Sequence, residues 1–380
     1  MDMSQIRQRI DKIDADMVEL YKQRMEAVSE IGEYKRANKL PIYDSERERN
    51  LLNKVAEQAG EEYEGGVRAM FQTIMELSRS YQLRTSGRTS ELAARMNAAV
   101  ESTEQLFPPK AMVACQGVEG AYSQIACEKL FKTPSIMYCK NFESVFAAIE
   151  AGLCRYGVLP IENSLAGSVN SVYDQMISHN FYIVRSARIK IDHSLLARPG
   201  VKLEQVREVY SHEQALSQCS RFLAAHKDIH VTVCSNTAAA AKMVSESDRD
   251  DVAAIASSNC GALYGLNCIG SDIQNDGNNH TRFICISKKL EIYPGADRTS
   301  LMAVLPNRVG SLYHMLSRFY ALGINLTKLE SRPMPGHDFE FMFYFDVDAS
   351  IYSPGLKQMI TELDTELEQF TYLGSYSEVV

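Results

Sequence analysis

The stretch Asn278-Asn279-His280-Thr281-Arg282-Phe283 decides how the fold and function of this chain are interpreted. Five polar side chains come in a row, and the apolar segment 283–286 follows at once without regular alternation. A short apolar run of this kind is typical of a strand buried on both faces. Proteins with α/β folds bind ligands at the ends of such strands. The stretch therefore predicts a ligand site, although a polar loop without a ligand fits the same residues.

The region 111–287 alternates short apolar segments with helical patterns, which favours layers of parallel strands and helices. Strands are expected at 111–115, 135–139, 156–160, 206–210, 229–234, 252–256 and 283–287. Helices are expected at 143–151, 169–178, 214–226 and 237–245. The segment 181–197 contains two strands without a helix between them. We interpret it as a crossover between two lobes, with the ligand in the cleft.

Polar residues cluster where these strands lead into helices. Examples are Tyr122-Ser123 after the first strand, Glu162-Asn163-Ser164 after the third, Ser211-His212, and Ser235-Asn236-Thr237. The start of a helix offers free backbone N–H groups and a favourable dipole to a carboxylate. Ordinary helix capping explains any one of these clusters equally well.

These segments resemble the prephenate dehydratase family from end to end. The most diagnostic pieces are Pro160-Ile161-Glu162-Asn163 and the Asn-x-Thr-Arg-Phe motif at 279–283, whereas Val118 and Gln124 depart from the common family pattern. The resemblance implies the two-lobed fold of periplasmic type II binding proteins and conversion of prephenate to phenylpyruvate, with loss of CO₂ and water. It implies substrate contacts at Tyr122, Ser123, Glu162, Asn163, Ser164, Ser235, Asn236, Thr237, Asn279, Thr281 and Arg282.

Three of these residues receive individual roles in that interpretation. Thr281 is expected to contact the departing ring hydroxyl, because the family match singles it out. Glu162 is a candidate to supply or orient the proton that leaves with it. Arg282 is either a counter-charge for the substrate or a brace for the loop.

The N-terminal region 1–90 has a helical stripe of apolar residues that runs from Ile6 to Ile31 without a Gly or Pro. A helix over 4–38 would be about 50 Å long, which suggests packing across two protomers. Arg24 and Lys35 lie on the apolar stripe, where an unpaired charge is costly, so a bound anion is expected there. Snorkelling or an internal salt bridge would also satisfy them.

Two further helices are expected, one from about residue 44 after Pro41 and one over 66–83. Ser45 and Glu48 fit a capping box at the start of the first of these. Ser78 and Gln82 lie on the inward row of the second, where apolar residues would be normal. The polar positions thus repeat the anomaly seen in the first helix.

This region resembles the all-helical chorismate mutase family over its full length. The resemblance implies an intertwined homodimer in which Arg7 comes from the partner chain. Lys35 and Gln82 are assigned to the ether oxygen of chorismate, and Arg7 and Arg24 to its carboxylates. It places the ligand contacts at Arg7, Arg24, Lys35, Asp44, Arg47, Glu48, Ser78 and Gln82.

Residues 91–110 are interpreted as an interdomain linker with a weak helix, preceded by the small polar segment 85–90. Beyond it, the segment 299–376 has the order βαββαβ, with strands at 300–305, 324–329, 339–347 and 370–376 and helices at 310–322 and 356–367. This order predicts an α+β ferredoxin-like sandwich.

The C-terminal segment resembles an ACT domain. Two motifs carry the resemblance, Asn307-Arg308-Val309-Gly310-Ser311-Leu312 and Glu330-Ser331-Arg332-Pro333. The resemblance implies binding of phenylalanine and feedback inhibition; a simple dimerisation sandwich is the alternative. Effector contacts are expected at Asn307, Val309, Gly310, Leu312, Glu330, Ser331 and Arg332.

Composition narrows the class of protein. The 380 residues carry 40 Lys and Arg against 48 Asp and Glu, intermixed, with a net charge of −8. This argues against nucleic acid or an anionic membrane as a partner. A signal peptide and an apolar membrane span are not expected. The nine cysteines, all within 115–285, are interpreted as buried thiols of a reducing cytoplasm rather than disulfides or a metal site.

Taken together, the three regions resemble the bifunctional chorismate mutase–prephenate dehydratase family. The domains are expected at 1–90, 111–287 and 299–376, with no cofactor and with small molecules as substrates. Two alternatives stay open. One is a small-molecule sensor, which would leave Arg24 and Lys35 unexplained. The other is a dehydratase whose helical region serves only in dimerisation.

Overall fold

The computed structural model describes residues 2–85, 90–307, 309–334 and 340–380. These residues divide into two compact units. The first comprises Met1–Ala94, Val309–Arg318 and Lys357–Glu368, and the second comprises Arg95–Arg308, Phe319–Leu356 and Gln369–Val380. Residues 86–89 of the expected linker, Arg308 of the first effector motif and 335–339 of the C-terminal strand pair lie outside the described residues.

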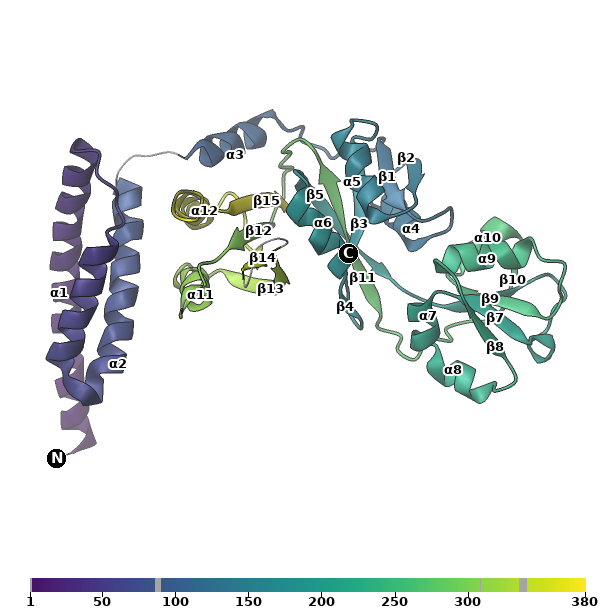
Figure 1. The fold of residues 1–380 in the computed structure, drawn as a ribbon, viewed down its shortest axis with the longest axis horizontal. Coiled ribbons are helices and arrows are strands. Elements are labelled where there is room, and N and C mark those ends of the chain that lie inside the picture. The colour runs from purple at the N-terminus through teal and green to yellow at the C-terminus, as the bar shows by residue number, and fades with distance from the viewer. Residues whose placement is uncertain (1, 86–89, 308, 335–339) are drawn as a thin grey trace. The chain divides into compact units, whose positions relative to one another are not determined.

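The N-terminal region is helical, as predicted (Figure 1). Helix α1 spans Met3–Ala37 and α2 spans Ser45–Thr85. Two helical segments meet within α2 at Gly60, whose φ of 71° and ψ of 168° are available almost only to glycine. The third predicted helix therefore begins near residue 61 rather than at residue 66.

Helix α2 is capped by Asp44 rather than by the expected pair of Ser45 and Glu48. The Asp44 Oδ1 atom accepts the Arg47 N–H at 3.0 Å. Glu48 instead forms an ion pair with Arg79, further along α2. Glu48 is therefore held by a cation of its own helix and not by the helix start.

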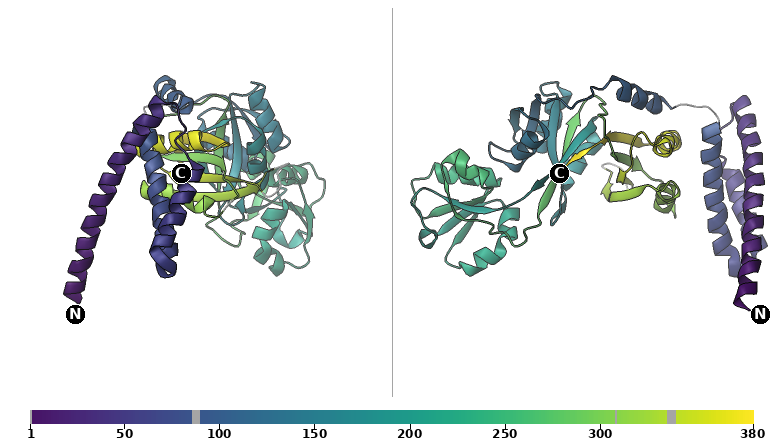
Figure 2. Two further views of the ribbon diagram at one scale, coloured as in Figure 1. Left: turned by 60° about the vertical axis from the view of Figure 1, so that its left-hand side comes forward. Right: turned by 180° about the vertical axis from the view of Figure 1, so that it is seen from behind.

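Helix α1 leaves most of its apolar stripe in solvent within this chain. Ile6, Ile10, Ile13, Met17 and Leu20 are 40–64% exposed, whereas Val28, further along the helix, is buried. The helix is 35 residues long, and Figure 2 shows it as an extended rod. An apolar row of this length fits the prediction of a helix that packs across protomers.

The second unit contains two lobes built on separate sheets. The first sheet has the order β16-β5-β11-β3-β1-β2, with β4 paired to β3. Helices α4 (Tyr122–Leu130), α5 (Phe142–Glu150) and α6 (Asn170–Ser178) accompany it, after α3 (Glu91–Ser102). Its strands are β1 (Met112–Gln116), β2 (Ser135–Cys139), β3 (Tyr156–Asn163), β4 (Gly167–Ser168), β5 (Tyr182–Lys190), β11 (His280–Ser287) and β16 (Glu378–Val379).

The second sheet has the order β10-β6-β9-β7-β8. Its strands are β6 (Ser194–Ala197), β7 (Glu208–Ser211), β8 (His230–Val233), β9 (Val252–Ala256) and β10 (Asn267–Gly270). Its helices are α7 (Glu213–Gln218), α8 (Ser220–Ala225), α9 (Thr237–Ser245) and α10 (Asn259–Tyr264). The chain crosses between the lobes twice, from β5 to β6 and from β10 to β11, which confirms the predicted crossover (Figure 2).

The prediction of parallel strands is only partly correct. Strands β1, β2 and β3 run parallel, and so do β7, β8 and β9. Strand β11 runs antiparallel to both of its neighbours, β3 and β5, and β6 runs antiparallel to β9. The reason is the double crossover, because β11 re-enters the first lobe from the cleft side rather than after a helix.

The C-terminal strands form a third sheet with the order β13-β14-β12-β15, all neighbours antiparallel. They are β12 (Arg298–Val304), β13 (Asn325–Pro333), β14 (Phe341–Asp348) and β15 (Phe370–Tyr376). With α11 (Ser311–Ala321) and α12 (Pro354–Glu366), the chain order is βαββαβ, as predicted.

The first and third sheets share a core within the second unit. Ile284 and Ile286 of β11 belong to one buried cluster with Met302, Met342 and Tyr376 of the third sheet. Strand β15 approaches β5 so closely at Gly374 that a Cβ there would lie 2.2 Å from the Ile183 carbonyl oxygen. The backbone contact therefore depends on the absence of a side chain.

All nine cysteines are free thiols. Seven are buried, but Cys234 is partly exposed and Cys268 is exposed, so the expectation of uniformly buried thiols is wrong for these two. Among the described helices, none combines the length and apolarity needed to span a membrane.

We expect Gly374→Ala to lower the free energy of unfolding of the second unit by roughly 3 kcal/mol or more, because it adds a backbone clash to a strained φ of +138°. Gly152→Ala is the matched control. Gly152 also has a positive φ, +72°, but nothing lies within 4 Å of an added Cβ, so a loss of about 1 kcal/mol is expected. Urea unfolding measures both, and equal losses would contradict the close approach of β15 to β5.

Candidate functional sites

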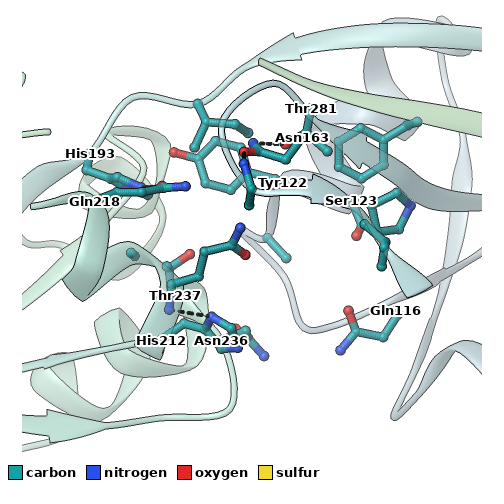
Figure 3. Close-up of a pocket in the computed structure, with 18 of the residues that line it drawn as sticks. Gln116, Tyr122, Ser123, Asn163, His193, His212, Gln218, Asn236, Thr237 and Thr281 are labelled. Atoms are coloured by element: carbon teal, nitrogen blue, oxygen red, sulfur yellow. Dashed lines mark hydrogen bonds between the residues drawn. The ribbon is translucent and has the colours of Figure 1, made fainter. Parts of the chain in front are cut away.

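A cavity of about 530 Å³ lies between the two lobes of the second unit (Figure 3). The first lobe contributes Gln116, Tyr122, Ser123, Asn163 and Thr281, and the second lobe contributes residues from the starts of α7 and α9. The remaining lining residues are Ala121, Phe142, Pro160, Ala166, Gly167, Ser168, Val169, Ile191, His193, His212, Gln214, Ala215, Gln218, Ser235, Asn236, Thr237 and Phe283.

Thr281 and Asn163 form the polar wall of this cavity. They stand opposite each other on the antiparallel pair β11 and β3, and the Asn163 Nδ2 atom donates to Thr281 Oγ1 at 2.9 Å. The Asn163 Oδ1 atom accepts the N–H groups of Leu165 and Ala166, which fixes the amide in this orientation. Because Asn163 donates to the threonine oxygen, the threonine O–H is free to donate to a bound ligand.

A chain of hydrogen bonds continues behind this wall. Asn163 Nδ2 also donates to Asn279 Oδ1 at 2.7 Å, and Asn279 Nδ2 donates to Gln218 Oε1 at 3.1 Å. Gln218 Oε1 lies 2.9 Å from His193 Nε2. Since an amide oxygen can only accept, the histidine carries its proton on Nε2. This series of hydrogen bonds joins both lobes and ends at the Thr281 hydroxyl.

Burial shifts the pKa values of the two ring side chains beside these hydrogen bonds. It lowers the pKa of His193, which favours the neutral imidazole. It raises the pKa of the Tyr122 phenol, which stays protonated and donates to the Asp192 carbonyl at 2.5 Å. Both rings therefore contribute as neutral hydrogen-bonding groups.

The cavity wall contains no Lys, Arg, Asp or Glu among the described residues. The positive potential needed for an anion must come from elsewhere. Helices α4 and α9 begin at the cavity, with Tyr122 and Thr237 as their first residues. The first backbone N–H groups of a helix have no intrahelical acceptor and lie at the positive end of its dipole. These two starts can receive carboxylates.

A second cluster of polar side chains lies between α1 and α2 in the first unit. Arg24 Nη1 donates to Ser78 Oγ at 2.5 Å, and burial lowers the pKa of the arginine. Lys35 Nζ donates to the Ile42 carbonyl at 2.5 Å. Gln82 is buried and packs its Cγ against Gly32, 3.2 Å from where a Cβ would be. Four of the residues predicted to bind chorismate are thus gathered between the two helices.

The other predicted residues of this cluster are placed differently. Asp44 caps α2, and Glu48 pairs with Arg79. Arg7 lies seventeen residues before Arg24 on the same helix, about 26 Å away at 1.5 Å per residue. Arg7 therefore cannot join the site of its own chain.

The comparisons with known proteins agree with this geometry. Residues 6–83 match the family model "Chorismate mutase type II", and residues 113–291 match the model "Prephenate dehydratase". The bifunctional chorismate mutase/prephenate dehydratase of Enterobacter agglomerans is 30% identical, over 98% of this chain and 95% of that protein. The chain belongs to the family of bifunctional chorismate mutase/prephenate dehydratases. It is an enzyme with a mutase and a dehydratase domain, and it serves phenylalanine biosynthesis.

Two further relatives cover the dehydratase part. Arogenate dehydratase/prephenate dehydratase 2 of Arabidopsis thaliana is 38% identical over 70% of this chain and 72% of its own length. The crystal structure of a prephenate dehydratase from Arthrobacter aurescens in complex with L-Phe is 28% identical, with a TM-score of 0.64 over 70% of this chain and 90% of that chain. The two-lobed fold is therefore that of the prephenate dehydratases.

Seven of the eleven residues predicted to contact prephenate line the dehydratase cavity. These are Tyr122, Ser123, Asn163, Ser235, Asn236, Thr237 and Thr281. Asn279 is fully buried behind Asn163, in the hydrogen-bonded chain. Ser164 ties the end of β3 to the start of β11, since its hydroxyl accepts the His280 N–H at 3.0 Å.

Glu162 and Arg282 do not line the dehydratase cavity, which differs from our expectation for both. Successive side chains of a strand point to opposite faces. Because Thr281 and Phe283 face the cavity, Arg282 faces the third sheet, where it pairs with Asp346. Glu162 stands opposite Arg282 in the register and faces the same way, towards Lys328.

The residues predicted to bind phenylalanine are likewise divided, with some in contact with the dehydratase lobe and others exposed. Glu330 and Arg332 of β13 contact the dehydratase lobe, through Ser168 and Asp174 respectively. Ser331 lies between them and is exposed on the opposite face of the strand. Asn307 and Val309 are exposed, and Gly310 and Leu312 are half-buried.

Sequence reasoning missed several residues of the dehydratase cavity, notably Gln116, His193 and Gln218. Gln116 ends β1 and lies one residue beyond the predicted strand. Gln218 lies inside an expected helix and His193 inside the expected crossover, so neither was singled out as a site residue. A signal that could have found His193 is the polar run Asp192-His193-Ser194 within the predicted crossover between the lobes.

We expect Asn163→Asp to lower the dehydratase kcat by roughly 10²-fold while the protein stays folded. The isosteric carboxylate still accepts the N–H groups of Leu165 and Ala166, but it can no longer donate to Thr281. The threonine O–H would turn towards it and away from the substrate. Asn141→Asp, at the cap of α5, is the control, because Asn141 acts there only as an acceptor. A dehydratase rate equal to that of the control would refute the assignment.

Proposed function

We propose that the chain converts chorismate to prephenate at one site and prephenate to phenylpyruvate at a second, separate site, with Thr281 at the centre of the second site. The observation that carries this proposal is the Thr281 hydroxyl, which is buried at the cavity wall and accepts a hydrogen bond from the Asn163 amide, so that its own proton can be donated to a ligand. The domain division that we propose is 1–90 for the mutase, 111–287 for the dehydratase and 299–376 for a regulatory domain.

The mutase site needs neither a nucleophile nor a cofactor. Chorismate rearranges by breaking a C–O bond while a C–C bond forms, and negative charge develops on the ether oxygen. Lys35 and Gln82 would stabilise this oxygen, and Arg24 would bind a carboxylate, with Ser78 orienting its guanidinium. The present contact of Lys35 with the Ile42 carbonyl shows that its ammonium reaches the loop between α1 and α2.

The exposed apolar stripe of α1 supports a homodimer. A second copy of the helix would cover Ile6, Ile10, Ile13, Met17 and Leu20. It would also bring Arg7 of the partner subunit towards Arg24, which Arg7 of the same chain cannot approach. The mutase site would then be complete only in the dimer.

The dehydratase reaction breaks two bonds of prephenate. The electron pair of the C–CO₂ bond moves into the ring as CO₂ leaves, the ring becomes aromatic, and the hydroxyl at the far end takes a proton from solvent and leaves as water. The Thr281 hydroxyl would donate a hydrogen bond to this oxygen as it departs. The starts of α4 and α9, with Ser123, Asn236 and Thr237, would bind the two carboxylates.

The C-terminal domain is proposed to be an ACT domain that binds phenylalanine. Its element order and sheet order fit a ferredoxin-like sandwich. The Arthrobacter aurescens relative was crystallised with L-Phe. Phenylalanine would bind preferentially to a less active arrangement and shift the population towards it.

A crossed pair of variants tests the two sites. Lys35→Ala should lower mutase turnover by roughly 10²–10³-fold and leave turnover of added prephenate unchanged. Thr281→Ala should lower dehydratase turnover by roughly 10²–10⁴-fold and leave the mutase unchanged. Separate assays with chorismate and with prephenate give both rates. Loss of both activities in either variant would point to misfolding instead, which thermal denaturation would detect.

We expect the dehydratase to prefer prephenate to arogenate by at least about tenfold in kcat/KM. Arogenate carries an ammonium group where prephenate has a keto group, and no acidic side chain lines the cavity among the described residues. A desolvated cation without a partner is costly. Rates with both substrates under identical conditions test this. Equal or better use of arogenate would show that a carboxylate reaches the ligand.

Phenylalanine in the millimolar range should lower the rate of phenylpyruvate formation from prephenate. The reason is that a ligand favouring one arrangement shifts the equilibrium by its differential affinity. Tyrosine at the same concentration is the control. A rate unaffected by phenylalanine would leave the C-terminal domain without a sensing role.

A further inference from the structure

Five charged side chains gather between the dehydratase lobe and the third sheet, all within the second unit. We call them the charge cluster: Glu162, Arg282, Lys328, Glu330 and Asp346. Lys328 Nζ lies 2.8 Å from Glu162 Oε1 and 3.7 Å from Glu330 Oε2. Arg282 pairs with Asp346, and its Nη2 atom lies 3.6 Å from Glu162 Oε2. Glu162 thus connects the two cations.

Three members of the charge cluster are largely removed from water, whereas the side chains of Glu330 and Glu162 are 23% and 36% exposed. The side chains of Arg282, Lys328 and Asp346 are 9%, 12% and 14% exposed. Burial acts to lower the pKa of Arg282, but Asp346, together with Tyr376 and Tyr173, raises that pKa above its ordinary value. Buried ion pairs resist the removal of one partner, because the remaining charge is left in a poor solvent. Moving Arg282 or Lys328 away from its carboxylate partners is therefore costly.

One end of the charge cluster reaches the wall of the dehydratase cavity. Lys328 Nζ donates to Ser168 Oγ at 2.7 Å, and the Ser168 hydroxyl donates to Glu330. Ser168 lines the cavity and stands opposite Glu162 in the pairing of β4 with β3. Arg282 directly follows Thr281 on β11. The cluster is therefore in contact with both strands that carry the polar cavity wall.

The other end belongs to strand β13, where an effector motif is predicted. Burial alternates along this strand, and Lys328, Glu330 and Arg332 point inwards. Arg332 holds Asp174 of α6 through two hydrogen bonds of 2.8 and 3.0 Å. A ligand that binds to Glu330-Ser331-Arg332 must therefore act on a strand whose inward side chains already hold the dehydratase lobe.

We propose that Lys328 couples the effector site to the dehydratase cavity, as the positioning residue of both Ser168 and Glu162. The proposal rests on the phenylalanine sensing proposed above and names its route. When an effector displaces β13, the hydrogen bonds of Lys328 to Ser168 and Glu162 carry the displacement to the strands that hold Asn163 and Thr281. The coupling is reciprocal for binding: the factor by which phenylalanine weakens substrate binding is also the factor by which bound substrate weakens phenylalanine binding.

The test compares each variant with itself, with and without phenylalanine. Lys328→Met keeps most of the side-chain volume but removes the charge and the hydrogen bonds. Its ratio of dehydratase rates without and with saturating phenylalanine should fall towards one, from an expected wild-type factor of about 5–150. Calorimetry should show phenylalanine still binding. Lys328→Arg, which can still reach both partners, should restore most of the ratio.

Arg188→Gln is the matched control. Arg188 of β5 pairs with Glu378 at 2.9 Å, so this change removes an ion pair of β5 that touches neither the cavity wall nor β13. Its phenylalanine ratio should equal that of the wild type. Glu162→Gln is a second probe that leaves no cavity; it should lower the ratio in the same direction if Lys328→Met proves unstable on heating.

The outcomes separate the two proposals. A wild-type ratio in Lys328→Met and in Glu162→Gln, with phenylalanine bound, would overturn the coupling route but not the sensing. A wild-type enzyme that neither binds phenylalanine nor responds to it would overturn the sensing, and the route with it. A lowered ratio in Arg188→Gln as well would show a general effect of interface charges and would also overturn the specific role of Lys328.

Discussion

The antiparallel strand β11 is the constraint on which the rest of the second unit depends. It lies between β3 and β5, and its odd-numbered side chains, Thr281 and Phe283, form the cavity wall. Its even-numbered side chains, Arg282 and Ile284, pack against the third sheet. Because successive side chains of one strand point to opposite faces, a displacement of the β11 backbone reaches both the cavity wall and the third sheet. A bulge between Arg282 and Phe283 lets both Asn163 and Pro160 of β3 face the cavity.

The two sites solve the same electrostatic problem in different ways. In the mutase site that we propose, the half-buried side chains of Arg24 and Lys35 would meet a dianion. The dehydratase cavity offers neutral donors and helix starts. The cation Arg282 lies in the charge cluster, on the other face of the strands that form the cavity wall. Hydrogen-bond donors help the hydroxyl to leave. A salt bridge to the ring carboxylate would instead stabilise its charged form, although this group must leave as uncharged CO₂.

The amino-acid sequence was sufficient to predict most of the elements. Periodicity located α1 and the strands at 135–139 and 252–256, because long or strongly apolar segments carry their own signal. It could not give the direction of β11, since an isolated strand reads the same way in either orientation. The helix break at Gly60 was missed because Gly65-Gly66 offered a stronger local signal five residues later.

The lack of three-dimensional information in a sequence also explains which site residues were predicted and which were missed. Asn163 and Thr281 were found, but so were their chain neighbours Glu162 and Arg282, because a motif is contiguous in sequence whereas a strand divides it between two faces. Gln218 and His193 were missed because the hydrogen bonds that give them a role join segments 25 and 61 residues apart. Only the folded chain brings these residues together.

The uncovered stripe of α1 means that the two activities should respond differently to dilution. If a second chain supplies Arg7, the mutase site exists only in the dimer, and its turnover per chain falls once the protein concentration drops below the dissociation constant of the dimer. The dehydratase cavity is built entirely from one chain, between strands of the same unit. A cell with little of this protein would then hold an enzyme that still consumes prephenate but has ceased to make it.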